Sequence, residues 1–167
     1  VHWVTANELI IVTNWCCVLL HDINTSSVLV IAGNMKSNTS AVVCSCICGD
    51  NLLAVGLIDG TVLVYDTMNN EWVFTLTEAV PNRVVSVFAY GNCGIVAFNH
   101  AGQGVVIQLV NEWTYKKIHL KIPGKITACQ YVSRGIVVLG NEKGIMQIYS
   151  IVEDVSILTF KLPKFEK

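Results

Sequence analysis

Residues 52–66 read Leu-Leu-Ala-Val-Gly-Leu-Ile-Asp-Gly-Thr-Val-Leu-Val-Tyr-Asp, and this stretch decides the fold. Two apolar runs meet at Asp59-Gly60, a dipeptide suited to a two-residue turn that needs positive φ, which we expect at Gly60. The pattern predicts a β-hairpin whose strands are apolar on both faces. Because both faces of such a hairpin must be covered, the stretch also predicts a stack of sheets.

The composition fits a chain with many short buried strands. Hydrophobic residues make up 53% of the 167 residues and charged residues only 14%, which excludes a disordered chain. No apolar run approaches the roughly 18 residues of a membrane-spanning helix, so we expect no direct insertion into a membrane. The sequence opens with Val1 inside an expected strand, so we expect a segment of a longer protein.

Charge is distributed unevenly along the chain. The net charge of −1 argues against nucleic acid as the main ligand. Residues 1–82 hold one basic and seven acidic residues (−6), whereas residues 83–167 hold ten basic and five acidic residues (+5). The second half therefore either presents a basic surface to an acidic partner or carries its cations on solvated strand edges and loops.

The cysteines indicate a reducing compartment. The chain has seven, with no Cys-x-x-Cys pair, and Cys44, Cys46 and Cys48 alternate along one expected strand, so they share a face. Their backbones lie about 6.6 Å apart from one to the next, at the far end of disulfide range. We interpret them as small buried apolar residues of a cytoplasmic protein. Two glycosylation sequons, at Asn24 and Asn38, favour secretion instead and receive less weight.

An internal repeat with a period of about 42 residues organises the chain. The expected opening strands begin at Val42, Val84 and Ile126, each one period after the last. Asn70-Glu71-Trp72 returns as Asn111-Glu112-Trp113, within one position of the same period, and the strands after each turn begin at residues 16, 61, 105 and 145. These registers predict four units of four strands each, over residues 1–33, 41–78, 83–121 and 125–162.

The best-defined unit resembles the WD-repeat family. Its Gly56-Leu-Ile-Asp59-Gly60-Thr-Val-Leu-Val-Tyr65-Asp66 follows the family's pattern of Gly-Ser, Asp-Gly, an alternating strand and Trp-Asp, with Tyr65 in place of the tryptophan. No Gly-His precedes any opening strand, so the family's buried His–Ser–Trp–Asp network is not expected here. The resemblance implies an all-β fold, a β-propeller segment of about four four-stranded antiparallel blades within a larger, seven-bladed ring, held mainly by apolar packing.

No pattern of catalytic residues emerges from the sequence. The four histidines, His2, His21, His100 and His119, are spread over three units, and none stands in a recognisable spacing from a nucleophile or carboxylate. We therefore expect no enzyme, no cofactor and no metal site. The resemblance implies a scaffold that binds protein or peptide partners, such as a ubiquitin-ligase substrate receptor or adaptor. The alternative is a structural propeller of a membrane-traffic coat or ciliary transport complex.

One rim of the expected propeller gathers the candidate binding residues. They lie in the turn between the second and third strands or in the linker before an opening strand: Trp15, Arg83, His100, Lys125 and Lys143. Arg83 and Lys125 are separated by one repeat period, so they are repeat equivalents near the expected channel mouth. Two cations there favour an acidic or phosphorylated peptide. The alternative is that both side chains only keep their linkers in contact with solvent.

The two tryptophans of the repeated Asn-Glu-Trp sequence allow two interpretations. As equivalent residues at the start of outermost strands, Trp72 and Trp113 either anchor a partner or cover the blade edge by packing on the hairpin beside them.

Overall fold

The computed structural model describes residues 1–32, 40–91, 94–133 and 135–163, and the sequon at Asn38 lies outside these ranges. The chain forms four separate four-stranded sheets, and within each sheet every strand pairs antiparallel with the strand that follows it along the chain. Among the described residues, no helix is long and apolar enough to cross a bilayer. The predicted all-β fold of four-stranded blades is confirmed.

The strands of blades one and two are β1 (His2–Trp3), β2 (Glu8–Val12), β3 (Val18–Asp22), β4 (Ser27–Ala32), β5 (Val42–Cys48), β6 (Leu52–Leu57), β7 (Val62–Asp66) and β8 (Glu71–Leu76). Those of blades three and four are β9 (Ser86–Tyr90), β10 (Gly94–Phe98), β11 (Gln103–Leu109), β12 (Trp113–His119), β13 (Ile126–Ser133), β14 (Ile136–Asn141), β15 (Ile145–Ser150) and β16 (Val155–Lys161).

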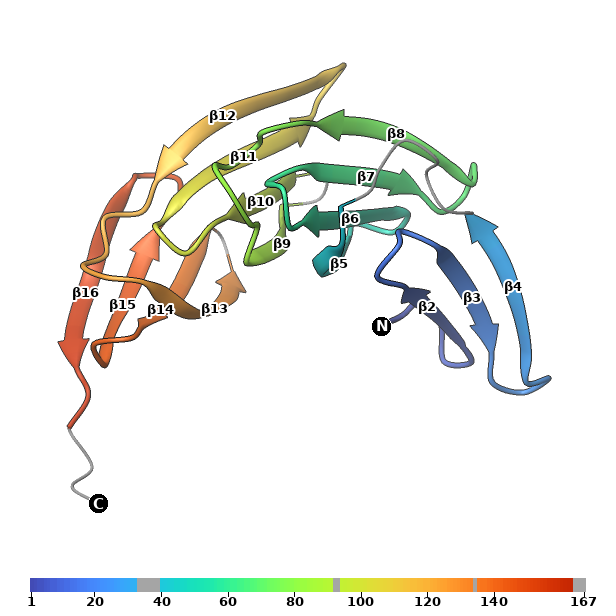
Figure 1. Cartoon of the computed structure of the whole chain (residues 1–167), viewed down its shortest axis with the longest axis horizontal. Coiled ribbons are helices and arrows are strands. Elements are labelled where there is room, and N and C mark those ends of the chain that lie inside the picture. The colour runs from blue at the N-terminus through green and yellow to red at the C-terminus, as the bar shows by residue number, and fades with distance from the viewer. Residues whose placement is uncertain (33–39, 92–93, 134, 164–167) are drawn as a thin grey trace.

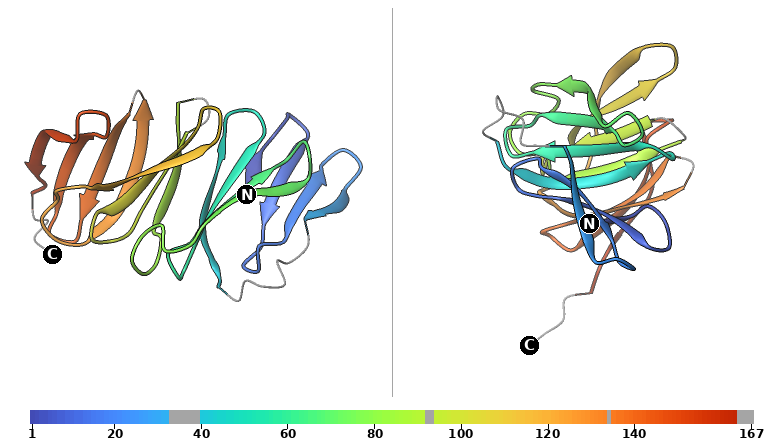
Figure 2. Two further views of the ribbon diagram at one scale, coloured as in Figure 1. Left: turned by 90° about the horizontal axis from the view of Figure 1, so that it is seen from above. Right: turned by 90° about the vertical axis from the view of Figure 1, so that its right-hand side faces the viewer.

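The four sheets stand side by side along an open arc (Figures 1 and 2). The opening strands β5, β9 and β13 lie toward the concave side, and the closing strands β4, β8, β12 and β16 lie toward the convex side (Figure 1). Blade one, at the right of that view, and blade four, at the left, end the arc. This arrangement brings the opening strands of successive blades together on the concave side.

Three apolar clusters fill the seams between successive blades. Ile10 and Val18 of blade one pack with Leu53 and Tyr65 of blade two, and similar clusters join blade two to three and three to four. The core strands β6, β7 and β10 are buried almost throughout. Since full burial of one such side chain contributes about 1.5–3 kcal/mol, seam packing is the main source of stability.

The β6–β7 turn has the conformation that Asp59-Gly60 suggested, with one difference. Gly60 has φ +88°, as predicted. However, the N–H of Leu57 donates to the C=O of Thr61 and the N–H of Gly60 donates to the C=O of Leu57, so the loop has three residues rather than two. This is a tight turn followed by a left-handed residue, in which only the third loop position needs positive φ.

The same turn recurs in every blade. Gly102 (φ +78°) and Gly144 (φ +71°) follow Gly60 at intervals of one repeat period, and Cys16 (φ 57°) takes the position in blade one. Val106 and Ile148 follow Val64 at the same interval, and each of the three occupies the same position in the pairing of the second and third strands of its blade. The repeat alignment from the sequence placed the start of the third strand of blade three at residue 105. This was wrong by two positions, because the alignment compared apolar residues rather than hydrogen-bonded pairs.

Polar contacts between segments supplement the apolar seams. The Tyr65 hydroxyl donates to the carbonyl of Ile31 in blade one (2.9 Å). In blade three, the Asn99 amide donates to the carbonyl of Pro81 (2.8 Å), and its Oδ1 accepts the N–H of Ala101 and Gln103. Asn141 repeats this arrangement in blade four with the carbonyl of Pro123. The sequence did not reveal these contacts. The two asparagines fix the linkers at Pro81 and Pro123 to the turns beside them.

Trp72 and Trp113 pack against other aromatic rings rather than standing free as anchors. Trp72 is opposite Tyr65 in the β7–β8 ladder, with ring centroids 5.1 Å apart. Trp113 is opposite Leu109 and stacks on Phe74 of blade two, with centroids 5.0 Å apart. Both are half-buried. The two residues are therefore not equivalent in register, although the sequences around them match.

The cysteines of β5 share a face, as the alternation predicted. Cys48 is fully buried in the seam between blades two and three, and Cys44 and Cys46 are half-buried against the same cluster. Cys16, Cys17, Cys44, Cys46 and Cys129 are free thiols. Burial raises the pKa of Cys44 to about 12, despite the opposing charge of Arg83, and raises the pKa of Cys129 to about 12 despite a hydrogen bond with Ser86.

The raised thiol pKa values predict low reactivity in the folded state. Only the thiolate attacks a disulfide reagent, so at pH 8 we expect Cys44 and Cys129 to react about two orders of magnitude more slowly in the native protein than in guanidinium. Timed labelling followed by peptide mass spectrometry measures each cysteine separately. Equal rates in the native and unfolded states would contradict this prediction.

Candidate functional site

The turns between second and third strands define one edge of the molecule, which we call the turn rim (turns 13–16, 57–60, 99–102 and 141–144). Each of the first three turns accepts a backbone hydrogen bond from the start of the next blade. The C=O groups of Asn14, Leu57 and His100 accept the N–H groups of Val42, Val84 and Ile126, respectively, at 2.8–3.1 Å. These repeated bonds bring the turn of one blade beside the opening strand of the next.

His100 makes the closest contact of this kind. Its Nδ1 lies 2.7 Å from the carbonyl oxygen of Ile126, whose N–H donates to the carbonyl of His100. Because a carbonyl can only accept, Nδ1 must carry a proton, and Nε2 is the ring nitrogen that remains for another partner. The half-buried imidazole therefore has a fixed orientation between blades three and four.

A pocket of about 360 Å³ opens beside His100. Its walls come from the opening strands of three blades, because Val43 belongs to β5, Ser86 to β9, and Thr127 and Cys129 to β13. Phe98 and Val85 contribute apolar surface to the same pocket. We call this the mouth pocket, since it lies where the opening strands meet the turn rim.

Arg83 supplies the positive charge of the mouth pocket. It lines the pocket, is exposed, and lies close enough to Cys44 of blade two to oppose the rise in the pKa of that thiol. A guanidinium carries five N–H donors in a planar fork that matches a carboxylate or a phosphate. With the hydroxyls of Ser86 and Thr127 nearby, the pocket can accommodate an anionic group.

The other predicted rim residues lie outside the mouth pocket. Lys125 is exposed and directly precedes Ile126; its N–H donates to Oε1 of Glu142 at 3.3 Å. The stem of Lys143 packs against Gly124, in the same linker as Lys125. Trp15, 59% exposed, stands in the turn of blade one. The structure thus brings Arg83 and His100 together, places Lys125 beside one wall, and leaves Trp15 in a separate turn.

Sequence reasoning missed the inner-strand residues of this pocket. Ser86, Thr127 and Cys129 belong to no recognisable motif. One signal was available, since alternate residues of an opening strand face the same side. Among the described residues, no group of three His, Cys, Asp or Glu side chains is arranged to hold a metal ion.

Comparisons with known proteins give structural likeness without sequence likeness. No family model matches the chain, and no curated protein matches its sequence. The β-propeller domain of Cps50 (Swd1) from Myceliophteria thermophila superposes with a TM-score of 0.73 at 13% identity, covering 94% of this chain and 53% of that one. The structure of U3-55K gives a TM-score of 0.72 at 18% identity, covering 93% and 48%.

A chain of the mitotic checkpoint complex gives a TM-score of 0.67 at 16% identity, covering 92% of this chain and 49% of its own length. The chain therefore spans about half the length of the solved structures it resembles. Identities this low carry information about the fold alone. Together with the four blades and their recurrent turn, these likenesses show that the chain has the fold of a β-propeller segment.

Proposed function

We propose that this chain is a protein-interaction scaffold whose mouth pocket binds an acidic or phosphorylated side chain of a partner peptide. The single observation that carries the proposal is the convergence of Arg83 and His100, from different segments of blade three, on one pocket walled by β5, β9 and β13. A rigid stack of blades holds these groups in place, so little ordering is needed when a peptide binds.

The chemistry of the mouth pocket supports an anionic partner. Arg83 offers a bidentate fork, and charge-assisted hydrogen bonds from a guanidinium to carboxylate or phosphate are about twice as strong as neutral ones. Lys125, just beyond Ile126, adds a second cation on the approach to the pocket. A role as substrate receptor or adaptor, in the reducing cytoplasm that the buried cysteines suggest, accords with such peptide recognition better than a purely structural coat role.

Charge reversal at the mouth tests this proposal. Anisotropy titrations with fluorescent acidic, phosphoserine and neutral peptides should show that Arg83→Glu weakens binding of the anionic peptides about tenfold or more, since an interfacial charge contact of this kind is worth at least about 1.4 kcal/mol. Lys125→Glu should have a smaller effect, because its ammonium lies outside the pocket.

Lys117→Glu is the matched control, because it makes the same charge change on the closing strand β12. It should leave affinity within about twofold of the parent. Acidic-peptide binding that survives both Arg83→Glu and Lys125→Glu would refute the proposed site.

A further inference from the structure

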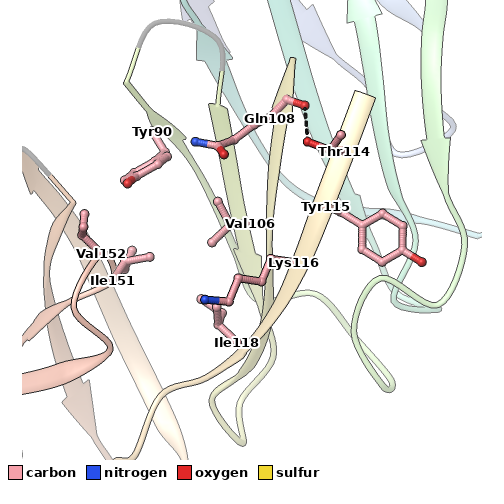
Figure 3. A pocket seen from close by; sticks show the side chains of 9 residues that line it. All are labelled: Tyr90, Val106, Gln108, Thr114, Tyr115, Lys116, Ile118, Ile151 and Val152. Carbon is pink, nitrogen blue, oxygen red and sulfur yellow. Dashed lines mark hydrogen bonds between the residues drawn. The ribbon is translucent and has the colours of Figure 1, made fainter. Parts of the chain in front are cut away.

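A second pocket, of about 240 Å³, lies at the seam between blades three and four. Figure 3 shows Tyr90, Val106 and Ile118 of blade three facing Ile151 and Val152 of blade four, with Lys116 extending across Ile118. We call it the seam pocket. It shares no lining residue with the mouth pocket.

The preceding seam shows one way in which this place is covered. In blade two, Val64 pairs with Phe74; in blade three, one repeat period later, Val106 pairs with Lys116. Lys116 is therefore the repeat counterpart of Phe74. At the seam between blades two and three, the ring of Phe74 is covered by Trp113, stacked 5.0 Å away at an interplanar angle of 23°.

Neither aromatic ring has a counterpart at the next seam. The residue one repeat period after Trp113 is Val155, which begins β16 and carries no aromatic ring. The turn before β16 begins at Ile151, the repeat counterpart of Leu109. Val152, 63% exposed, follows there and is far smaller than tryptophan. The aromatic stack therefore covers, one blade earlier, the surface that corresponds to the Lys116 wall of the seam pocket. The part of that earlier seam beside Cys48, Asp66 and Leu109 keeps a pocket of its own.

Size and charge define the occupant. A volume of about 240 Å³ lies below the roughly 300–1,000 Å³ of pockets for drug-sized ligands, and it suits a single side chain. Val106, Ile118 and Ile151 form an apolar wall that suits an aromatic ring. Gln108 and Thr114 add polar groups to the same lining. Lys116 places an exposed ammonium on an aliphatic stem at the edge, where it can pair with a carboxylate.

We propose that the seam pocket receives one aromatic side chain of a partner protein, with a neighbouring carboxylate of the same segment paired to Lys116. The inserted ring covers the Lys116 wall, as the Phe74–Trp113 stack covers the corresponding surface at the preceding seam. Aromatic anchors buried in such pockets commonly dominate the affinity of an interface. This surface is independent of the mouth pocket and does not rest on the function proposed for it.

Fluorescein-labelled peptides provide the test. The probe is Gly-Ser-Asp-Trp-Asp-Ser-Gly, compared by anisotropy with one peptide in which Ala replaces Trp and another in which Lys replaces both Asp residues. We expect the loss of the ring to weaken binding about tenfold or more and the reversed charges to weaken it about threefold to tenfold.

Variants of Lys116 identify the site. Lys116→Phe restores the residue type of Phe74, so it should fill the seam pocket, keep or raise the melting temperature and abolish binding of the tryptophan peptide. Lys116→Met should remove only the preference for aspartate over lysine. Lys117→Met is the control, because Lys117 pairs with Val105 and so faces the other side of the sheet.

Val152→Trp supplies an independent second variant, since its ring would enter the pocket from blade four. Binding of the tryptophan peptide that persists in both Lys116→Phe and Val152→Trp would overturn the proposal. So would equal binding of the tryptophan and alanine peptides, or no binding of the tryptophan peptide at millimolar protein.

Discussion

Gly60→Val is expected to destabilise the chain by about 3 kcal/mol or more. A β-branched residue at the φ of +88° costs about 1–3 kcal/mol by itself. A Cβ at this position would also overlap the backbone oxygens of Val80 and Asn82 in the following linker. Backbone atoms cannot move aside as a flexible side chain can, so overpacking adds about 1–3 kcal/mol.

Thermal melting followed by circular dichroism measures the effect. For a chain of this length, about 2–4 °C are lost per kcal/mol, so we expect the melting temperature to fall by about 6–12 °C. Gly144→Val is the matched control. Gly144 occupies the same turn position at φ +71°, but nothing in the described part of the chain lies within 4 Å of its added Cβ, so only the backbone cost of about 1–3 kcal/mol remains.

Equal losses in the two variants would mean that the linker does not constrain the β6–β7 turn. An unchanged melting temperature for Gly60→Val would remove this turn from the centre of the fold.

The isolated chain is expected to self-associate through the far faces of its end blades. On blade four, Val138, Ile148 and Leu158 form one row across three strands, and Met146 pairs with Phe160 in the next row. Leu158 is 51% exposed and Phe160 39% exposed. They lie on the face of blade four that points away from blade three. The equivalent face of blade three packs against blade four, and there Val96, the counterpart of Val138, is fully buried.

Blade one has a similar far face. Leu19 pairs with Val30 and His21 with Val28, and both valines are more than half exposed. Apolar patches of this extent promote association in water. Size exclusion with light scattering should therefore give a mass of at least two chains of 18.3 kDa each.

Paired lysines should break this association. Ile148→Lys with Leu158→Lys places two charges in the row on blade four, so we expect the measured mass to fall toward that of one chain. Val110→Lys is the control, because Val110 is 79% exposed between β11 and β12, outside the far face. A wild-type chain that stays monomeric at high micromolar concentration would contradict the prediction.

The sequence by itself determined the repeat, the strand class and the positive φ at Gly60. Alternation of apolar residues, the regular repeat period and Gly60 are local features, because strand pairing between neighbours and the sign of φ depend on adjacent residues. For the same reason, the shared face of Cys44, Cys46 and Cys48 could be inferred from spacing alone. Arg83 and His100 could be assigned to one rim once the order of strands in a blade was assumed.

Only the tertiary structure decided which residues meet across blades. The hydrogen bond of His100 to Ile126, the stacking of Trp113 on Phe74 and the two pockets join segments from different repeats. Trp72 and Trp113 show why the sequence could not predict these contacts. Both belong to an Asn-Glu-Trp sequence, yet Trp72 pairs with Tyr65 and Trp113 pairs with Leu109. Such contacts depend on ladder register and on side-chain volume at each seam, and a local pattern fixes neither.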